Sequence, residues 1–174
     1  TGPSANTPIP PPRLPAANGE ALSFDCDPSH PVPTIGGNFS ALDPIATSGA
    51  YDQVEAPECF GSRAPYLPLA ARPDVLVFQT PPLTVPTELI GPIEVELWAT
   101  TNGPDTDFTA KLVDVYPASA DYPRGYAMLL TDGIARLRYV DTPEYPRLRQ
   151  PGELTRVKIT LPPVANRVLP GHRI

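Results

Sequence analysis

The sequence lacks a long apolar run and a cluster of basic residues. No segment approaches the roughly 20 consecutive apolar residues that a transmembrane helix needs, so no membrane span is predicted. The 13 Lys and Arg residues are scattered among 19 Asp and Glu, and the net charge is −6. Because nucleic-acid binding needs clustered cations, we expect neither nucleic acid nor a membrane as a partner.

The groups that nucleophilic catalysis requires are also scarce. The chain has two histidines, His30 and His172, and no G-x-S-x-G segment. Serine hydrolysis needs a nucleophile within hydrogen-bond reach of a base. Ser29 precedes His30, but adjacent side chains of an extended segment point apart. We therefore expect a solvated loop residue at His30, a turn residue at His172 and no catalytic residue in this chain.

Only two cysteines are present, Cys26 and Cys59. They flank a turn-rich segment, and a disulfide between them would close it; the alternative is two free thiols. Their spacing matches no zinc pattern, so we predict neither a metal nor a cofactor. The compartment stays open, because a bridge favours secretion and free thiols favour the cytoplasm.

Proline, in contrast, is abundant, with 27 residues beside 12 glycines. Nine of these prolines fall in residues 1–33, which excludes a helix or a central strand there. We predict a proline-rich extended arm or linker over 1–33 and a long loop region over 34–73 that packs on a sandwich. The apolar content of 41% is too high for a fully disordered chain.

From Asp74 onward, apolar and polar residues alternate with the period of a β-strand. Turn residues separate the strands, and no segment shows helical periodicity. The pattern predicts an all-β fold over residues 74–174, either a β-sandwich or a jelly roll; the jelly-roll β-sandwich that we expect is of the galactose-binding-like type. A further strand opens at Arg173, so we expect the jelly roll to be incomplete at its C-terminal end. The expected strands are 74–80, 93–100, 107–116, 154–161 and a hairpin over 126–140 that turns at 131–133.

Three side chains in this region are candidates for binding. Trp98 lies on the polar face of its strand, where it is an interface anchor, a carbohydrate platform or, if the sheet is covered, a core residue. Asp105 and Asp107 resemble a pair that binds calcium or acts as an acid–base couple. Because aspartates at turns cap backbone amides, we expect Asp105 and Asp107 to be turn residues.

An ordered series of segments resembles one family, the X-Pro dipeptidyl-peptidase and cocaine-esterase-like (CocE/NonD) serine hydrolases. Each segment is short, but together they follow the family's order over most of residues 27–174. The segments are Asp27–Gly37, Ala50–Gln53, Ala71–Phe78, Gly91–Trp98, Asp105–Tyr116, Leu130–Gly133 and Leu169–Ile174.

The resemblance implies that this chain is the family's C-terminal non-catalytic jelly-roll domain. The family's Ser–Asp–His triad belongs to an α/β-hydrolase domain upstream of this region, so no triad residue transfers to this sequence. The resemblance further implies a domain that walls the active-site cleft, stabilises the assembly and contributes to oligomer contacts in some members.

We therefore expect a chain that is not itself an enzyme, within a parent serine hydrolase for esters, amides or X-Pro peptides. Its expected partners are the α/β-hydrolase domain, in the same protein or a separate chain, and further copies of itself. The alternative is an independent jelly-roll module that binds carbohydrate or protein through Trp98, Asp105 and Asp107.

Overall fold

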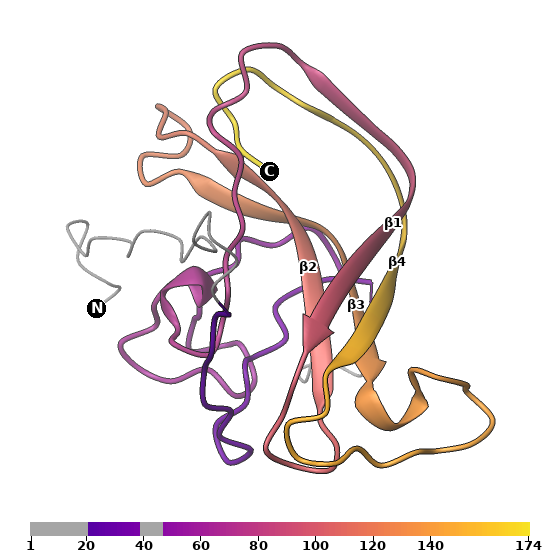
Figure 1. Cartoon of the computed structure of the whole chain (residues 1–174). Coiled ribbons are helices and arrows are strands. Elements are labelled where there is room, and N and C mark those ends of the chain that lie inside the picture. Colours follow the sequence, from indigo (N-terminus) through magenta and orange to yellow (C-terminus); the bar gives the residue numbers. More distant parts are fainter. Residues whose placement is uncertain (1–20, 39–46) are drawn as a thin grey trace. The chain divides into compact units, whose positions relative to one another are not determined.

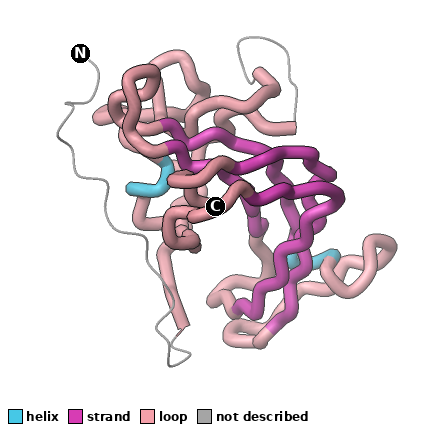
Figure 2. The backbone as a smooth tube through the Cα atoms, turned by 90° about the horizontal axis from the view of Figure 1, so that it is seen from above, coloured by secondary structure: helices cyan, strands magenta, loops and turns pink. Residues whose placement is uncertain are grey.

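A computed structural model describes residues 21–38 and 47–174 and confirms the all-β fold. Its strands are β1 (Thr87–Ala99), β2 (Asp107–Tyr116), β3 (Tyr126–Arg136) and β4 (Thr155–Val168). β1 pairs with β4, and β2 pairs with β3 (Figure 1). Helix is confined in the described residues to two single 3₁₀ turns, η1 (Leu69–Ala71) and η2 (Leu137–Tyr139), and the rest is loop (Figure 2).

Two parts of the sequence-based picture lie outside the described residues. Most of the predicted proline-rich arm falls in residues 1–20, and part of the predicted loop region falls in residues 39–46. Within the part of the chain that is described, no helix is long and apolar enough to cross a membrane.

The chain forms two compact units. Unit 1 draws its described residues from 21–38, 47–87, 113–129 and 168–174. Unit 2 comprises 88–112 and 130–167. β2 and β3 therefore each contribute residues to both units, whereas nearly all of β1 and β4 belongs to unit 2.

Unit 2 is a two-layer sandwich built on strict side-chain alternation. Along β4, Val157, Ile159 and Leu161 are buried, while the alternate residues Arg156, Lys158 and Thr160 are exposed. With Leu137 these three residues form the buried core. Half-buried residues from β1, β2, β3 and the segment after η2 pack against it: Ile93, Val95, Leu97, Phe108, Ala110, Leu112, Ala135 and Val140.

Ion pairs across the strands define the pairing direction. Glu94 binds Lys158 and Glu96 binds Arg156, so residue numbers rise on β1 as they fall on β4. Asp107 with Arg136, and Lys111 with Asp132, show the same relation between β2 and β3. Both two-stranded sheets are therefore antiparallel.

The predicted hairpin at residues 131–133 is wrong, because β3 runs through these residues without a turn. The buried Thr131 hydroxyl donates a hydrogen bond to the Pro162 carbonyl at 3.1 Å. A Cβ at Gly133 would lie 2.7 Å from Leu161 Cδ2, so the glycine permits close approach to β4. After β3, in η2, Leu137 is buried in the core and Tyr139 is exposed.

In unit 1, short bridges between loops replace long strands. The predicted strand over 74–80 is absent; instead, the Thr80 amide donates to the Ile174 carbonyl and the Leu83 amide to the His172 carbonyl. Further isolated antiparallel bridges join residues 52 and 128, 54 and 68, and 115 and 173. At the bridge between Gly37 and Gly49, the neighbouring Gly36 has φ 65°, and a Cβ there would overlap the Gly49 carbonyl.

Candidate functional site

The two candidate carboxylates of unit 2 are bound by arginines. Asp107 accepts two hydrogen bonds from Arg136, at 2.7 and 2.9 Å, and these bonds hold the pKa of Asp107 below its usual value. Asp105 accepts one from the Arg138 side chain at 2.5 Å and one from the Arg138 backbone amide at 2.9 Å. Asp105 thus caps a neighbouring segment, and neither carboxylate is left without a cationic partner.

No metal centre is formed by the described residues: none of their His, Cys, Asp and Glu side chains gather in groups of three or more that could hold an ion. Cys26 and Cys59 are both free thiols in the structure, the first exposed and the second half-buried. Burial raises the pKa of the Cys59 thiol, which lowers its thiolate fraction at neutral pH.

Trp98 is 64% exposed and points outward from β1. The core alternative for this residue therefore does not hold, and the interface and carbohydrate alternatives remain.

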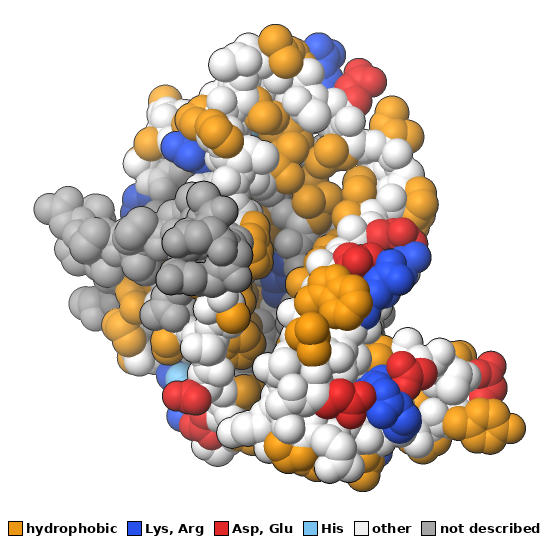
Figure 3. All heavy atoms as spheres, viewed as in Figure 1, with side chains coloured by type: hydrophobic (Ala, Val, Ile, Leu, Met, Phe, Trp, Pro, Cys, Tyr) orange, Lys and Arg blue, Asp and Glu red, His pale blue; other side chains and the backbone are white. Residues whose placement is uncertain are grey.

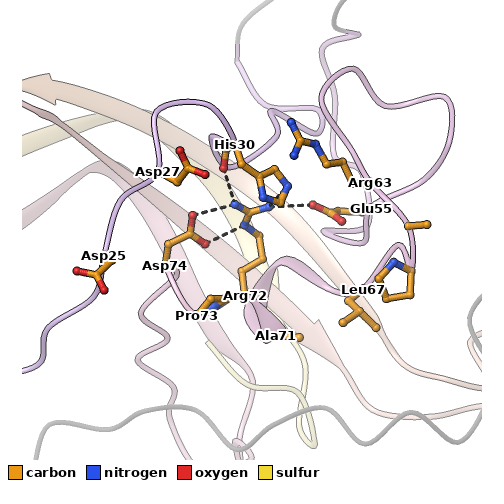
Figure 4. A pocket seen from close by; sticks show the side chains of 12 residues that line it. Asp25, Asp27, His30, Glu55, Arg63, Leu67, Ala71, Arg72, Pro73 and Asp74 are labelled. Carbon is orange, nitrogen blue, oxygen red and sulfur yellow. Dashed lines mark hydrogen bonds and ion pairs between the residues drawn. The ribbon is translucent and has the colours of Figure 1, made fainter.

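Unit 1 contains a hollow of about 290 Å³ that sequence reasoning did not single out (Figure 4). Seven of its twelve lining residues carry ionisable side chains, and the others are apolar. The ionisable residues are Asp25, Asp27, His30, Glu55, Arg63, Arg72 and Asp74.

Arg72, directly after η1, is the centre of this hollow. Its guanidinium donates two hydrogen bonds of 2.8 Å to the Asp74 carboxylate, with Glu55 on the opposite side at 3.2 Å (Figure 4). It also donates to the His30 carbonyl at 3.0 Å and contacts His30 Nε2 at 3.4 Å. The hydrogen bonds to Asp74 are the main reason that the pKa of Arg72 lies above its usual value.

These contacts make Arg72 a brace between loops. The side chains of Arg72 and Glu55 are 10% and 7% exposed, so the charges are largely removed from water. Its partners come from residues far apart in the chain, and they have no periodic apolar face to hold them together. The charge-assisted, bidentate hydrogen bonds between the guanidinium and a carboxylate hold these loops in place, where a strand would be held by a hydrophobic layer.

The hollow does not assemble a serine nucleophile. The Ser29 hydroxyl donates to Asp27 Oδ1 at 2.7 Å, and His30 Nε2 faces Arg72. The hydrogen bonds from Ser29 hold the pKa of Asp27 below its usual value. His30 is half-buried and is not the solvated loop residue that the sequence suggested.

A second buried polar pair joins Asp114 of β2 to His172. Asp114 Oδ1 and His172 Nδ1 are 2.8 Å apart, and the His172 ring lies 4.3 Å from the Tyr116 ring, centroid to centroid. His172 is 8% exposed, so it is an interior residue and does more than form the expected turn. In the described part of the chain, no hydroxyl or thiol is hydrogen-bonded to it, and the pair lacks a nucleophile.

Residues of the Arg72 brace and of the Asp114–His172 pair lie in segments that carry the family resemblance. Arg72 and Asp74 lie in Ala71–Phe78, Asp114 in Asp105–Tyr116 and His172 in Leu169–Ile174. A family model for the X-Pro dipeptidyl-peptidase C-terminal non-catalytic domain matches residues 35–174. The chain belongs to this family.

Relatives of this C-terminal domain are hydrolases. Cocaine esterase from Rhodococcus sp. (strain MB1 Bresler) is 39% identical over 148 residues, which are 85% of this chain and 22% of the esterase. A solved α-amino acid ester hydrolase is 30% identical with a TM-score of 0.57, over 74% of this chain and 25% of the hydrolase. An aminopeptidase from a marine sediment Thaumarchaeota archaeon is 28% identical with a TM-score of 0.56, over 75% and 25%.

The chain thus spans about a quarter of the length of these relatives. The match confirms the predicted family and fold, and it gives the chain the role of an accessory, non-catalytic domain of that hydrolase family.

Proposed function

We propose that this domain packs against the α/β-hydrolase domain of a serine hydrolase for esters, amides or X-Pro peptides, and that it walls the active-site cleft. The observation that supports the proposal is that this chain matches only about a quarter of the length of each relative. These relatives are an esterase, an ester hydrolase and an aminopeptidase. The remaining three quarters of those relatives contain the part that this chain would contact.

The loops of unit 1 are suited to form the wall. They expose large aromatic side chains, with Phe24, Phe60 and Phe78 at 42%, 71% and 56% exposure. At the same time, the Arg72 brace orders the segments that carry them. Exposed aromatics on an ordered loop are typical of a surface that a partner covers, because ordering them before contact reduces the entropy lost on binding.

A domain replacement in Rhodococcus cocaine esterase tests the proposal. The matching segment of the esterase is replaced by this chain, and hydrolysis of a p-nitrophenyl ester is compared with that of the esterase lacking the segment. We expect the replacement to restore turnover that a serine-directed inhibitor blocks, and the isolated chain to show none. Phe60→Ser should weaken the restored activity, whereas Tyr145→Ser, an equally exposed aromatic of unit 2, should not.

Two outcomes would contradict the proposal. One is a folded replacement with no more activity or thermal stability than the truncated esterase. The other is inhibitor-sensitive ester hydrolysis by the isolated chain, which would require a nucleophile within it.

A further inference from the structure

Three tyrosines of unit 1, Tyr116, Tyr122 and Tyr126, form a tyrosine cluster where β2 and β3 meet their connecting loop. The ring of Tyr116 lies 5.4 Å from that of Tyr122 and 5.8 Å from that of Tyr126, centroid to centroid. The rings of Tyr122 and Tyr126 are 4.9 Å apart, so each ring contacts the other two. Tyr122 is 38% exposed, and Figure 3 shows hydrophobic side chains at the surface over the connecting loop. The accessory role assigns no function to this cluster.

Hydrogen bonds in the loop between β2 and β3 fix the position of Tyr122. Its carbonyl accepts hydrogen bonds of 2.9 Å from the amides of Ser119 and Gly125, and its amide donates to Ser119 Oγ at 3.1 Å. The Tyr126 hydroxyl donates to the Ala50 carbonyl at 3.2 Å. The Tyr122 hydroxyl, in contrast, has no hydrogen-bond partner among the described residues. The cluster is thus an ordered aromatic surface with one hydroxyl that is available to a ligand.

A carboxylate lies directly beside this surface. Asp121 precedes Tyr122 in the loop, is exposed and forms no ion pair with another described residue. The cluster therefore offers a ligand three aromatic rings, a hydroxyl donor and a negative charge. These groups suit an apolar segment in the polyproline II conformation that carries a cation, because the backbone carbonyls of polyproline II have no internal hydrogen bonds.

The sequence contains such a segment at Pro8–Pro15, which lies outside the described residues. Five of its eight residues are proline, a composition that favours polyproline II with three residues per turn. In that conformation two of the three edges are entirely apolar: Pro8, Pro11 and Leu14 on one, and Ile9, Pro12 and Pro15 on the other. The third edge carries Arg13, the one basic residue of the first twenty.

We propose that Pro8–Pro15 docks on the tyrosine cluster of the same chain, with an apolar edge on the rings and Arg13 beside Asp121. Proline-rich segments bind aromatic side chains in this way because polyproline II is already extended and loses little conformational entropy on binding. A backbone carbonyl of the segment accepts a hydrogen bond from the Tyr122 hydroxyl. The contact is independent of the hydrolase contact, which we assign to the exposed phenylalanines of unit 1.

The connection between the segment and unit 1 is long enough for this contact. Ala21 is the first described residue, and it belongs to the same unit as the cluster. Arg13 precedes Ala21 by eight residues, which span about 25 Å at about 3.1 Å per residue. A unit of about 100 residues has a radius of gyration of about 13 Å, so this reach is about twice that radius.

Nuclear magnetic resonance of the full chain with labelled tyrosine rings tests the proposal. We expect nuclear Overhauser effects between the Tyr122 ring and proline side-chain protons that disappear in the double variant Pro11→Ala with Pro12→Ala. The ring resonances of the cluster should shift in the same variant, whereas that of Tyr145, on a loop of unit 2, should not. Pro3→Ala, a proline substitution outside the segment, is the matched control and should change neither.

Trypsin cleavage after Arg13 measures the docking from the side of the segment. Because a segment tethered at a millimolar effective concentration is bound most of the time, Tyr122→Ser should raise the cleavage rate about fivefold. Asp121→Asn should raise it less, and high salt should remove the difference between this variant and the wild type, since salt screens the ion pair. Tyr145→Ser should leave the rate unchanged, and circular dichroism verifies that each variant is folded.

Three results would overturn the proposal. One is a set of cluster resonances that the proline substitutions leave unchanged, which would assign the cluster to another partner or to the packing of the loop alone. Another is cleavage after Arg13 at the same rate in the wild type and in folded Tyr122→Ser. The third is a cleavage rate that falls as the protein concentration rises, which would mean that the segment docks on another chain.

Discussion

The ion pairs between β1 and β4 in unit 2 are exposed, whereas the polar pairs that hold the loops of unit 1 are buried. The side chains of Glu94 and Lys158 are 55% and 52% exposed, but those of Asp114 and His172 in unit 1 are 3% and 10% exposed. The strands fill their interior with apolar residues and leave their ion pairs in water. The loops lack a periodic apolar face, and buried polar pairs hold them in place.

The loop of unit 2 between η2 and β4 supports this distinction, since it behaves like the loops of unit 1. Arg149 is 3% exposed, its Nη1 donates to Glu153 at 3.2 Å, and its Nη2 lies 2.9 Å from Asp141. The contrast is therefore between exposed ion pairs that join two strands and buried pairs that include a loop residue, rather than between the two units. Where proline and glycine interrupt the alternation, a buried guanidinium with two carboxylates replaces the apolar layer.

The largest effect on stability is expected for Arg72→Met, which tests this comparison because it leaves the buried Glu55 and the neighbouring Asp74 without their cation. Loss of one partner of a buried ion pair costs about 3–5 kcal/mol of the free energy of unfolding. Urea denaturation measures it, with Arg63→Met, an exposed arginine of the same hollow, as the matched control. Hydrogen exchange should accelerate around residues 27–30 and 53–55 before residues 155–161; uniform acceleration would contradict a local brace.

A smaller loss of the free energy of unfolding is expected for a substitution in the apolar core of unit 2. Ile159→Val removes one methylene from a residue that is 1% exposed, which costs about 0.5–1.5 kcal/mol of the free energy of unfolding. Lys158→Gln, the adjacent residue on the outward face, should leave the denaturation midpoint unchanged. If Lys158→Gln proves as destabilising as Ile159→Val, exposed ion pairs stabilise the strands and the comparison fails.

The smallest expected effect is a change of stability with pH that is caused by Asp52 in unit 1. Burial raises the pKa of Asp52 above its ordinary value of 3.8, so the folded chain binds the proton more tightly than the unfolded chain. Ionisation therefore lowers stability as the pH rises from about 3.8 through the folded pKa. In the wild type, Asp52 Oδ1 accepts a hydrogen bond from the Ala127 amide at 2.9 Å. Asp52→Asn keeps an oxygen that can accept this hydrogen bond, and it carries no charge.

Thermal unfolding at pH 3 and pH 7 measures this dependence. The midpoint of Asp52→Asn minus that of the wild type should be more positive at pH 7 than at pH 3. Asp121→Asn, an exposed carboxyl of the same unit, serves as the control. A difference that is the same at both pH values, or larger at pH 3, would argue against a buried carboxylate at position 52.

Alternation alone predicted the centres of β1 and β4, whereas the centre of β3 was wrongly predicted to be a turn. The pattern from Ile93 to Ala99 and from Val157 to Leu161 is correct residue by residue, because each strand has one face in the core. The ends were missed: β1 starts at Thr87 in spite of Gly91 and Pro92, and β4 continues to Val168 in spite of two prolines. A strand with one unpaired edge tolerates proline, which sequence rules treat as a strand end.

The buried polar pairs of unit 1 could not be predicted from the periodicity of apolar residues in the sequence. Arg72 and Glu55 are 17 residues apart, and Asp114 and His172 are 58 residues apart, in segments that have no common pattern. Arg72, Asp114 and His172 lie in segments of the family resemblance, which gives no contact, and Glu55 lies outside those segments. Asp105 and Asp107 were singled out from the sequence, but their partners were not: Arg138 lies in η2 and Arg136 at the end of β3.

The glycine in the middle of β3 constrains how this sequence can diverge. A Cβ at Gly133 would meet the Leu161 side chain at 2.7 Å and the Thr160 carbonyl at 3.1 Å. Shortening Leu161 would relieve the first overlap, and the second contact, which is with a backbone atom, would require a shift of a few tenths of an ångström. Positions 133 and 161 are therefore coupled across the two layers, because a side chain at 133 requires Leu161 to move or to be replaced by a smaller residue. Among homologous sequences, an alanine at the first position should be accompanied by a smaller residue at the second.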